Sequence, residues 1–237
     1  MTNQPAGVTS ETRQLVDGES LLEDLAIDQD EMEWRKSFVR LDETDKERMQ
    51  ALESTFDEVA PDVVDRFYDH LTSDPAANEI FGRSSKGMEQ LKSDQQAYLR
   101  SLTDGEYGRE YFARRARVGK IHDMLDLGPK FYLGAYSIYY EELLGAIGDS
   151  VKAEFEERDG AESAASESTS ERNVLSGLIG GGSSDSSAET TDDRATDVDA
   201  AVDAVVEQAT SLLKVLALDQ QVAMDTYIHA YSEAARK

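Results

Sequence analysis

The sequence predicts an all-α protein. Apolar residues recur at spacings of three and four along most of the chain, which is the period of a helix with one buried face. No segment alternates apolar and polar residues over the length of a strand. Ser, Thr or Asp precedes several of the periodic segments, as at a helix N-terminus. We therefore expect about eight helices with short connections, apart from one long loop.

Composition limits the class of protein. The 237 residues are enough for one domain with a sizeable core, and the net charge is −25. Such acidity repels nucleic acid and anionic membranes, and it resembles the composition of proteins from salt-loving (halophilic) cells. The chain has no cysteine, no apolar run of membrane-spanning length and no N-terminal signal sequence. We therefore expect a cytoplasmic protein with no nucleic-acid partner and no membrane span.

The N-terminal half contains a polar tail and several short helices. Residues 1–17 are aperiodic, so we expect a disordered N-terminal tail, followed by a helical domain over 18–155. Ser20, Asp28 and Thr44 each have Glu three residues later, the pattern of a capping box at a helix start.

The middle of the chain continues the helical pattern. Pro61 marks the start of a further helix, and Asp74 precedes a proline as the capping residue of the next. Helices over 85–102 and 106–124 follow. The helix over 129–148 is apolar on most sides, so we expect one face to meet its own core and another to meet a partner chain.

The last part of the chain changes composition. Residues 156–194 are rich in Ser, Gly, Ala and acidic residues, which predicts a disordered loop. Three glycines at 180–182 follow no predicted strand, so they do not indicate a phosphate-binding loop. Residues 195–237 return to a helical stripe, which we interpret as the last helix of the domain.

His122 is the candidate metal ligand. Val118 and Leu125 share its helix face, whereas His70 and His229 have charged residues four positions away. A neutral imidazole on an apolar face is either a hydrogen-bonded core residue or a ligand. Since the chain has neither cysteine nor a histidine pair at zinc spacing, a single histidine would suit haem, whose porphyrin supplies the other four nitrogens.

The neighbourhood of His122 is basic. Between Arg109 and Lys130 there are six basic residues and three acidic ones, in an otherwise acidic chain. Arginine suits carboxylates, so some of these side chains could hold haem propionates; the alternative is that they are ordinary surface residues. Gly119 could allow a haem to approach the helix closely.

Seven short segments are distinctive: FYDHL (67–71), EQLK (89–92), GEY (105–107), RVGKIH (117–122), LGP (127–129), YLGAY (132–136) and DQQVAMDTYI (219–228). Together they resemble the sensor domain of globin-coupled sensors, in particular that of archaeal haem-based aerotaxis transducers. They occur in the same order and at similar spacing, and the resemblance covers about 21–231 apart from the loop.

The resemblance implies a globin fold of the sensor type, with an extra N-terminal helix and two long last helices that form the four-helix bundle of a homodimer. It implies haem b, with its iron, as the cofactor and O₂ as the ligand, with CO and NO as further candidates. The implied function is an oxygen sensor for aerotaxis signal transduction, which acts on a signalling domain or chemotaxis partner and is not an enzyme. Alternatives are a free-standing globin that handles O₂ or NO, and a haem-free helical interaction protein.

The resemblance also implies roles for particular residues. His122 would be the proximal iron ligand, and Tyr68 the distal tyrosine that donates to bound ligand; from the residues alone, Tyr68 could equally be a core tyrosine. Tyr132 would be the pocket tyrosine beyond the proximal histidine, while Phe67 and Leu91 would line the pocket. We add Val118 to this set, because a backbone carbonyl near it could accept the second ring N–H of His122.

Two features depart from the family pattern. Asp94 stands where some relatives carry a threonine that reaches bound O₂, and a carboxylate there would be repulsive unless it is protonated or turned outward. Family members continue into a methyl-accepting coiled coil, whereas this chain ends at Lys237. We expect a sensor fragment, the sensor of a two-gene system or a free-standing globin.

Overall fold

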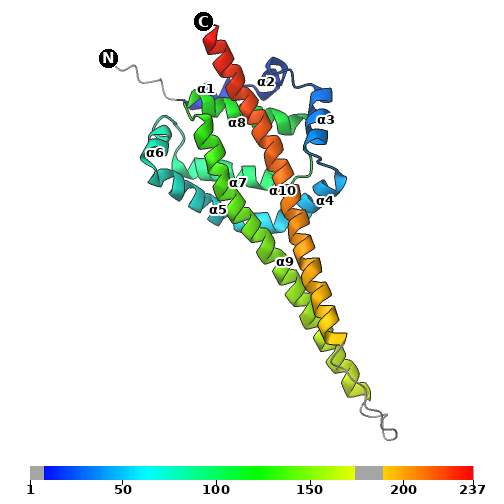
Figure 1. Cartoon of the computed structure of the whole chain (residues 1–237). Coiled ribbons are helices and arrows are strands. Elements are labelled where there is room, and N and C mark those ends of the chain that lie inside the picture. The colour runs from blue at the N-terminus through cyan, green and yellow to red at the C-terminus, as the bar shows by residue number, and fades with distance from the viewer. Residues whose placement is uncertain (1–7, 174–188, 237) are drawn as a thin grey trace.

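The computed structural model describes residues 8–173 and 189–236 and confirms the all-α prediction for them. Figure 1 shows the arrangement of the helices. In chain order they are α1 (Ser10–Gln14), α2 (Gly18–Asp24), α3 (Gln29–Phe38), α4 (Glu43–Ala51), α5 (Glu53–Ser73), α6 (Pro75–Phe81), α7 (Met88–Ser101), α8 (Arg109–Met124), α9 (Pro129–Asn173) and α10 (Glu189–Ala235).

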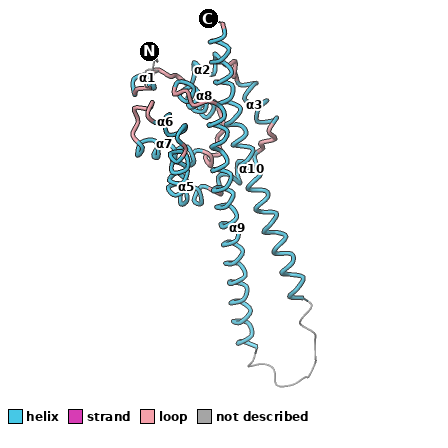
Figure 2. The backbone as a smooth tube through the Cα atoms, turned by 60° about the vertical axis from the view of Figure 1, so that its left-hand side comes forward, coloured by secondary structure: helices cyan, strands magenta, loops and turns pink. Residues whose placement is uncertain are grey.

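Helices α1 to α8 form a globular head, through which the two long helices α9 and α10 run. Both helices continue beyond the head as an antiparallel pair (Figures 1 and 2). Helix α10 packs mainly on α8 and α9, and α9 also packs on α5. Over the described ranges, no helix is long and apolar enough to cross a membrane.

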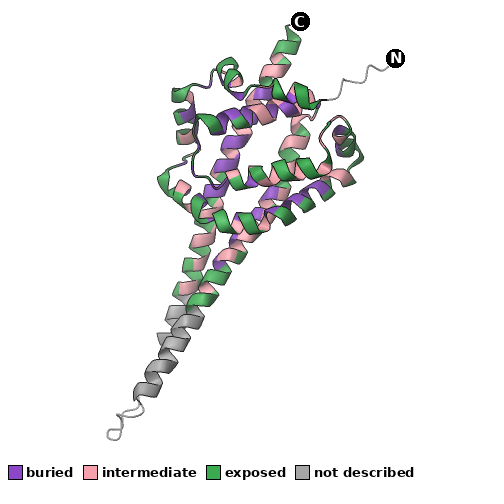
Figure 3. Cartoon of the chain, turned by 180° about the vertical axis from the view of Figure 1, so that it is seen from behind, coloured by how far each residue is buried: buried purple, intermediate pink, exposed green. Residues whose placement is uncertain are grey.

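The core lies in the head, where α5, α7, α8, α9 and α10 meet. Figure 3 shows that buried positions concentrate there, while the positions of α9 and α10 that are coloured beyond the head are mostly exposed or intermediate. On α9, Leu143 and Ile147 are fully buried, whereas Leu133 remains 43% exposed. The two sides of α9 therefore differ in burial as the sequence predicted. Other large side chains with almost no exposed surface are Phe56, Leu99, Tyr111, Phe112 and Tyr227.

The stretch 1–17, which we expected to be a disordered tail, contains helix α1. The Thr9 side chain accepts a hydrogen bond from the Thr12 N–H and so caps the helix. Val8 forms a short parallel bridge with the 83–85 segment. The cap is local, but the bridge is made by distant residues, so local composition did not reveal it; residues 1–7 lie outside the described part of the chain.

The expected loop over 156–194 is also partly helical. Helix α9 extends to Asn173 and α10 begins at Glu189. Ala and Glu are frequent here and have a high helix propensity, whereas Ser has a lower one. Because the segment extends a helix that has already formed, it needs no new nucleation step. The glycines at 180–182 lie outside the described residues.

Helix starts agree in part with the sequence signals. Asp28 and Asp74 cap α3 and α6 as predicted. Helices α2 and α4 begin earlier than predicted, after Asp17 and Asp42, because these carboxylates accept N–H bonds from the first turn. Pro61 lies within α5 and not at a helix start, since the buried face of α5 holds the helix together across it.

Gly119 allows α8 and α10 to approach each other. A methyl group in place of its hydrogen would lie 2.2 Å from the Thr226 Oγ1 and 3.1 Å from the Ala223 Cα, both on α10. The expectation that Gly119 makes room for a haem is therefore replaced by a packing role. The space in front of Gly119 is occupied by α10 and is not open to a haem.

We expect Gly119→Ala to lower the free energy of unfolding by about 1–3 kcal/mol, because the added methyl overpacks the contact with α10. Urea unfolding followed by circular dichroism measures this change. Gly134→Ala is the matched control: nothing lies within 4 Å of its added methyl, so we expect no loss and a gain of up to about 1 kcal/mol. Equal effects of the two substitutions would contradict the packing role.

Candidate functional site

The six predicted site residues lie on four helices that meet inside the head. Phe67 and Tyr68 come from α5, Leu91 from α7, Val118 and His122 from α8, and Tyr132 from α9. The structure forms two groups from them, one around Tyr68 and one around His122. Three aromatic contacts join the groups, through two tyrosines, Tyr136 and Tyr139, that were not among the predicted site residues.

These contacts run from α5 to α8. The ring of Phe67 stacks on that of Tyr139 with centroids 4.9 Å apart, and Tyr139 meets Tyr136 edge-on at 5.8 Å. Tyr136 lies 5.3 Å from Tyr132, whose ring is 5.6 Å from that of His122. The predicted distal and proximal residues therefore border one continuous aromatic cluster.

The His122 imidazole has the properties of a free ligand. Its Nδ1 is buried and has no hydrogen-bond partner among the described residues. Burial lowers the pKa of His122 to about 4, and the positive charge of Arg13 contributes to the same shift. The ring is therefore neutral near pH 7, as metal ligation requires.

The predicted hydrogen bond from His122 to a carbonyl near Val118 is not formed. Val118 lies one turn before His122 on α8, where backbone carbonyls accept the N–H groups of the following turn. A core histidine normally satisfies both ring nitrogens within the protein. The bare Nδ1 thus favours the ligand interpretation over the core interpretation.

Tyr68 supplies a buried hydroxyl near Leu91. The residue is 6% exposed, and its hydroxyl donates to the Leu91 carbonyl oxygen at 3.2 Å. Burial raises the pKa of Tyr68, and the negative charge of Asp94 raises it further, so the hydroxyl stays protonated. It can therefore act as a donor to a ligand if it exchanges its carbonyl partner.

Asp94 is turned away from the interior. Its side chain is 45% exposed, forms an ion pair with Lys86 and accepts a hydrogen bond from the Gln90 Nε2 at 3.0 Å. The carboxylate is therefore neutralised at the surface, and the repulsion expected for a buried carboxylate does not arise in this arrangement.

A hydrogen-bonded chain leads from Tyr132 to α10. The hydroxyls of Tyr132 and Tyr136 are 2.9 Å apart, and those of Tyr136 and Tyr98 are 3.3 Å apart. Tyr98 donates to the Asp219 Oδ2 at 2.8 Å. Sequence reasoning missed Asp219, although the signal was available: a carboxylate at helical spacing on the apolar stripe of the last helix must find buried partners.

Asp219 forms a buried ion pair with Arg115 on α8. The Arg115 Nε lies 2.9 Å from the Asp219 Oδ1, and the two side chains are 6% and 0% exposed. Tyr111 donates to the same oxygen, and the Arg115 guanidinium lies over the Tyr111 ring at 4.1 Å. The Arg115 Nη2 also donates to the Ser101 Oγ at 2.9 Å, so the pair is well satisfied by neutral groups.

The basic residues between Arg109 and Lys130 have partners within the chain. Arg117 donates to the backbone carbonyls of Arg13 and Val16. The remaining contacts are Arg109 with Glu19, Arg114 with Glu110, Arg115 with Asp219, Lys120 with Asp123 and Lys130 over the Phe131 ring. These contacts argue against the hypothesis that the six residues hold haem propionates. The alternative, that they are ordinary surface residues, does not hold for Arg115, which is buried.

The donor set fits a haem. One neutral imidazole with a bare buried nitrogen, a protonated tyrosine and an aromatic and aliphatic lining provide an axial ligand, a polar donor and an apolar surface. Within the described residues, no group of three or more acidic or histidine side chains could hold a metal ion by itself. His122 and Val118 on α8 would thus face Phe67, Tyr68 and Leu91 across the bound group.

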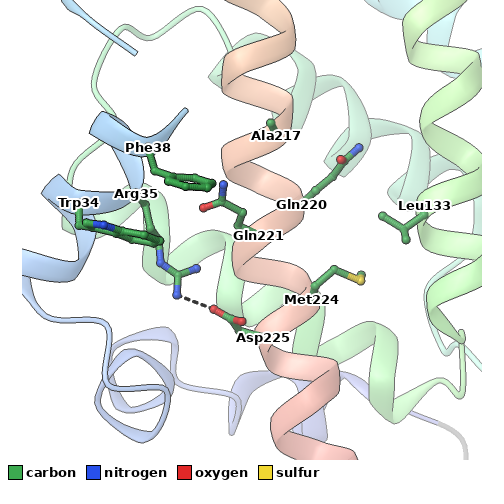
Figure 4. Close-up of a pocket in the computed structure, with 9 residues that line it drawn as sticks. All are labelled: Trp34, Arg35, Phe38, Leu133, Ala217, Gln220, Gln221, Met224 and Asp225. Atoms are coloured by element: carbon green, nitrogen blue, oxygen red, sulfur yellow. Dashed lines mark ion pairs between the residues drawn. The ribbon is translucent and has the colours of Figure 1, made fainter. Parts of the chain in front are cut away.

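A separate groove of about 550 Å³ lies on the surface between α3, α9 and α10. Figure 4 shows Trp34 and Phe38 on one side, and Leu133 and Met224 on the other. The Arg35–Asp225 ion pair, with an N–O distance of 2.6 Å, joins α3 to α10 at this groove. None of the six predicted site residues lines it, so the groove is a different feature of the molecule.

We expect Asp219→Asn to lower the free energy of unfolding by about 3–5 kcal/mol, because it leaves the Arg115 charge buried without a counter-ion. Chemical denaturation measures the loss. Asp57→Asn is the matched control, since Asp57 also pairs with an arginine, Arg100, but both side chains are about half exposed. Its expected cost is below about 1 kcal/mol, and a cost as large as that of Asp219→Asn would contradict the argument from burial.

We expect His122 to make the haem-free protein less stable in acid. The unfolded chain takes up a proton at the ordinary pKa of 6.5, whereas in the folded chain the pKa of His122 is about 4, so lowering the pH favours unfolding between these values. From pH 7 to pH 5 the expected loss attributable to this residue is about 2 kcal/mol.

The free energy of unfolding is measured at pH 7 and at pH 5 for the unaltered protein and for His122→Leu. The loss between the two pH values should be about 2 kcal/mol larger in the unaltered protein. His70→Leu removes an exposed histidine and should leave the pH dependence unchanged. A pH dependence that survives His122→Leu would show that other groups cause it.

Comparisons with known proteins agree with this arrangement. A solved structure of the globin domain of the Geobacter sulfurreducens globin-coupled sensor superposes with a TM-score of 0.57, covering 83% of this chain and 97% of that domain at 16% identity. At this identity the similarity concerns the fold, and it confirms the predicted globin fold of the sensor type.

Sequence similarity extends over nearly the whole chain. The haem-based aerotactic transducer HemAT of Halobacterium salinarum is 38% identical over 226 residues, which is 95% of this chain. The aligned chain spans only 38% of the length of that relative. The family model described as Protoglobin matches residues 28–170, more than half of the sequence. The chain therefore belongs to the protoglobin family.

Proposed function

We propose that the chain is a haem-based oxygen-sensing domain, which binds haem b through His122 and passes the state of the site to its last two helices. The observation that carries this proposal is the His122 ring, whose Nδ1 has no partner among the described residues and which contacts Tyr132, the first of the hydrogen-bonded tyrosines that lead to α10. The 38% identity to an aerotactic transducer supports aerotaxis as the setting. The relatives are a transducer and a sensor, so we propose no enzymatic activity.

Haem held by His122 would supply an iron that can bind a diatomic ligand such as O₂, CO or NO. Each predicted site residue would then have a different role. His122 presents a neutral nitrogen, and Tyr68 donates its hydroxyl to a partly negative ligand in place of the Leu91 carbonyl. Phe67 and Leu91 exclude water from that side, while Val118 packs beside the histidine.

Communication with the rest of the molecule would begin at Tyr132. A displacement of His122 changes its ring contact with Tyr132, whose hydroxyl is bonded to Tyr136. Tyr98 continues the chain of hydroxyls to Asp219 on α10. A sensor needs contacts that differ between its two states, and this series is the part of the site suited to provide them.

We propose that the chain forms a homodimer through α9 and α10, and that the dimer transmits the state of the site. Leu213, Ile228 and Tyr231 on α10 are 42%, 65% and 55% exposed. Exposed apolar side chains in such number on one helix indicate a protein interface, and a second copy of the chain would cover them. A signalling domain or a chemotaxis partner, as in the longer relative, would read the change.

Absorption spectroscopy tests the proposal. The protein, purified in high salt and supplied with haem, should give a Soret band that shifts reversibly with O₂ after reduction and is lost or grossly altered in His122→Ala. Tyr68→Phe should speed O₂ dissociation roughly fivefold to 150-fold, the equivalent of losing a hydrogen bond to a charged acceptor. Stopped-flow measurement gives that rate.

Tyr107→Phe is the matched control, because the Tyr107 hydroxyl also donates to a buried backbone carbonyl, that of Leu102, away from the site. Its O₂ dissociation rate should equal that of the unaltered protein. The absence of a Soret band in the haem-supplied protein would rule out the sensor and leave a helical interaction protein. Steady turnover of NO or peroxide with a reductant would favour the free-standing globin.

A further inference from the structure

Arg13 is a buried arginine whose hydrogen bonds are incomplete. It lies in α1, is 7% exposed, and its Nη2 donates to the Ser84 Oγ at 2.7 Å. Its Nε is buried and has no partner among the described residues. A buried guanidinium with a bare N–H is costly, so the arrangement calls for an acceptor that the described protein atoms do not provide.

The charge of Arg13 lies near the helix of His122. The segment that carries Arg13 packs on α8, because Arg117 donates to the Arg13 carbonyl and Val8 packs with Ile121, the chain neighbour of His122. Arg13 forms no ion pair with any residue in the described part of the chain, and the nearby carboxylate of Asp94 is already paired with Lys86. A cation without a carboxylate partner among the described residues therefore lies on the segment that packs against α8, the helix of His122.

The segment that carries Arg13 is fixed in place before any ligand arrives. Arg117 on α8 donates through its Nη2 to the Arg13 carbonyl at 2.8 Å. Val8 is 3% exposed and packs with Ile80, Ile121 and Leu125, two of which flank His122 on the chain. Arg13 is thus positioned against the helix that bears the histidine, and little conformational entropy remains to be lost on binding.

We propose that Arg13 holds a carboxylate of the ligand bound at His122, which on the proposed function is a haem propionate. A guanidinium matches a carboxylate in geometry and charge, and the pairing would satisfy the bare Nε. The six basic residues between Arg109 and Lys130 are engaged elsewhere, as their contacts show. In a chain with a net charge of −25, this cation offsets the repulsion that an anionic ligand would meet.

Haem release tests the proposal. The haem-loaded protein is mixed with a haem scavenger, and the loss of the Soret band gives the dissociation rate for protohaem and for its dimethyl ester, which lacks the two carboxylates. Arg13→Gln should speed protohaem release about tenfold to a hundredfold, because a charge-assisted hydrogen bond is lost. The same substitution should not change release of the ester.

Two further variants make the result decisive. Arg13→Lys keeps the charge without the planar fork and should give an intermediate rate for protohaem, and it serves as the test if Arg13→Gln does not fold. Arg109→Gln removes an exposed arginine that is paired with Glu19 and should release both haems at the unaltered rate.

Equal acceleration of both haems by Arg13→Gln would show that Arg13 only anchors α1, and it would overturn the proposal. No acceleration of protohaem release would overturn it as well. Failure of the proposed function is visible separately, since the unaltered protein would then show no Soret band with either haem.

Discussion

The buried ion pair between Arg115 and Asp219 is the interaction on which the arrangement of the head depends. Burying two opposite charges is favourable only if neutral donors and acceptors satisfy the remaining hydrogen-bonding capacity of both groups. Asp219 receives hydrogen bonds from Tyr98 on α7 and from Tyr111 on α8, while Arg115 donates to Ser101 on α7. One carboxylate on α10 therefore fixes the relative positions of three helices, and a slip of any of them breaks several bonds at once.

This constraint lies beside the candidate site. Helix α8 carries both Arg115 and His122, so the register that satisfies the ion pair also sets where the imidazole stands. Gly119, between them on the chain, brings α8 against α10 too closely for any side chain. If His122 moves, α8 cannot move alone, because Gly119 packs tightly on α10 and the His122 ring contacts Tyr132. Either α10 or Tyr132 and its hydrogen-bonded neighbours must move with it. Packed interfaces of this kind respond by discrete rearrangement, which suits a sensor.

The sequence predicted what depends on neighbours along the chain and missed what depends on neighbours in space. Helical periodicity identified the helices, and the apolar face of α8 identified His122. Asp219 lies on an apolar stripe, which indicates a buried carboxylate, but its partner Arg115 is on a distant segment, as Ser84 is for Arg13, and no local pattern identifies such partners. The tail prediction failed for the same reason, because α1 is held by groups from the 83–85 segment and α8 and not by its own composition.

The proposed role of Arg13 would explain how an acidic protein binds an anionic ligand. Most arginines near His122 are used to hold helices together, so their charge is already neutralised or directed at backbone carbonyls. The remaining positive charge comes from Arg13, on a short helix that is too small to fold alone and is held by contacts with the rest of the head. Binding a carboxylate there would stabilise the segment, and order in the segment would strengthen binding. Ligand affinity and the fold of the N-terminus are therefore linked.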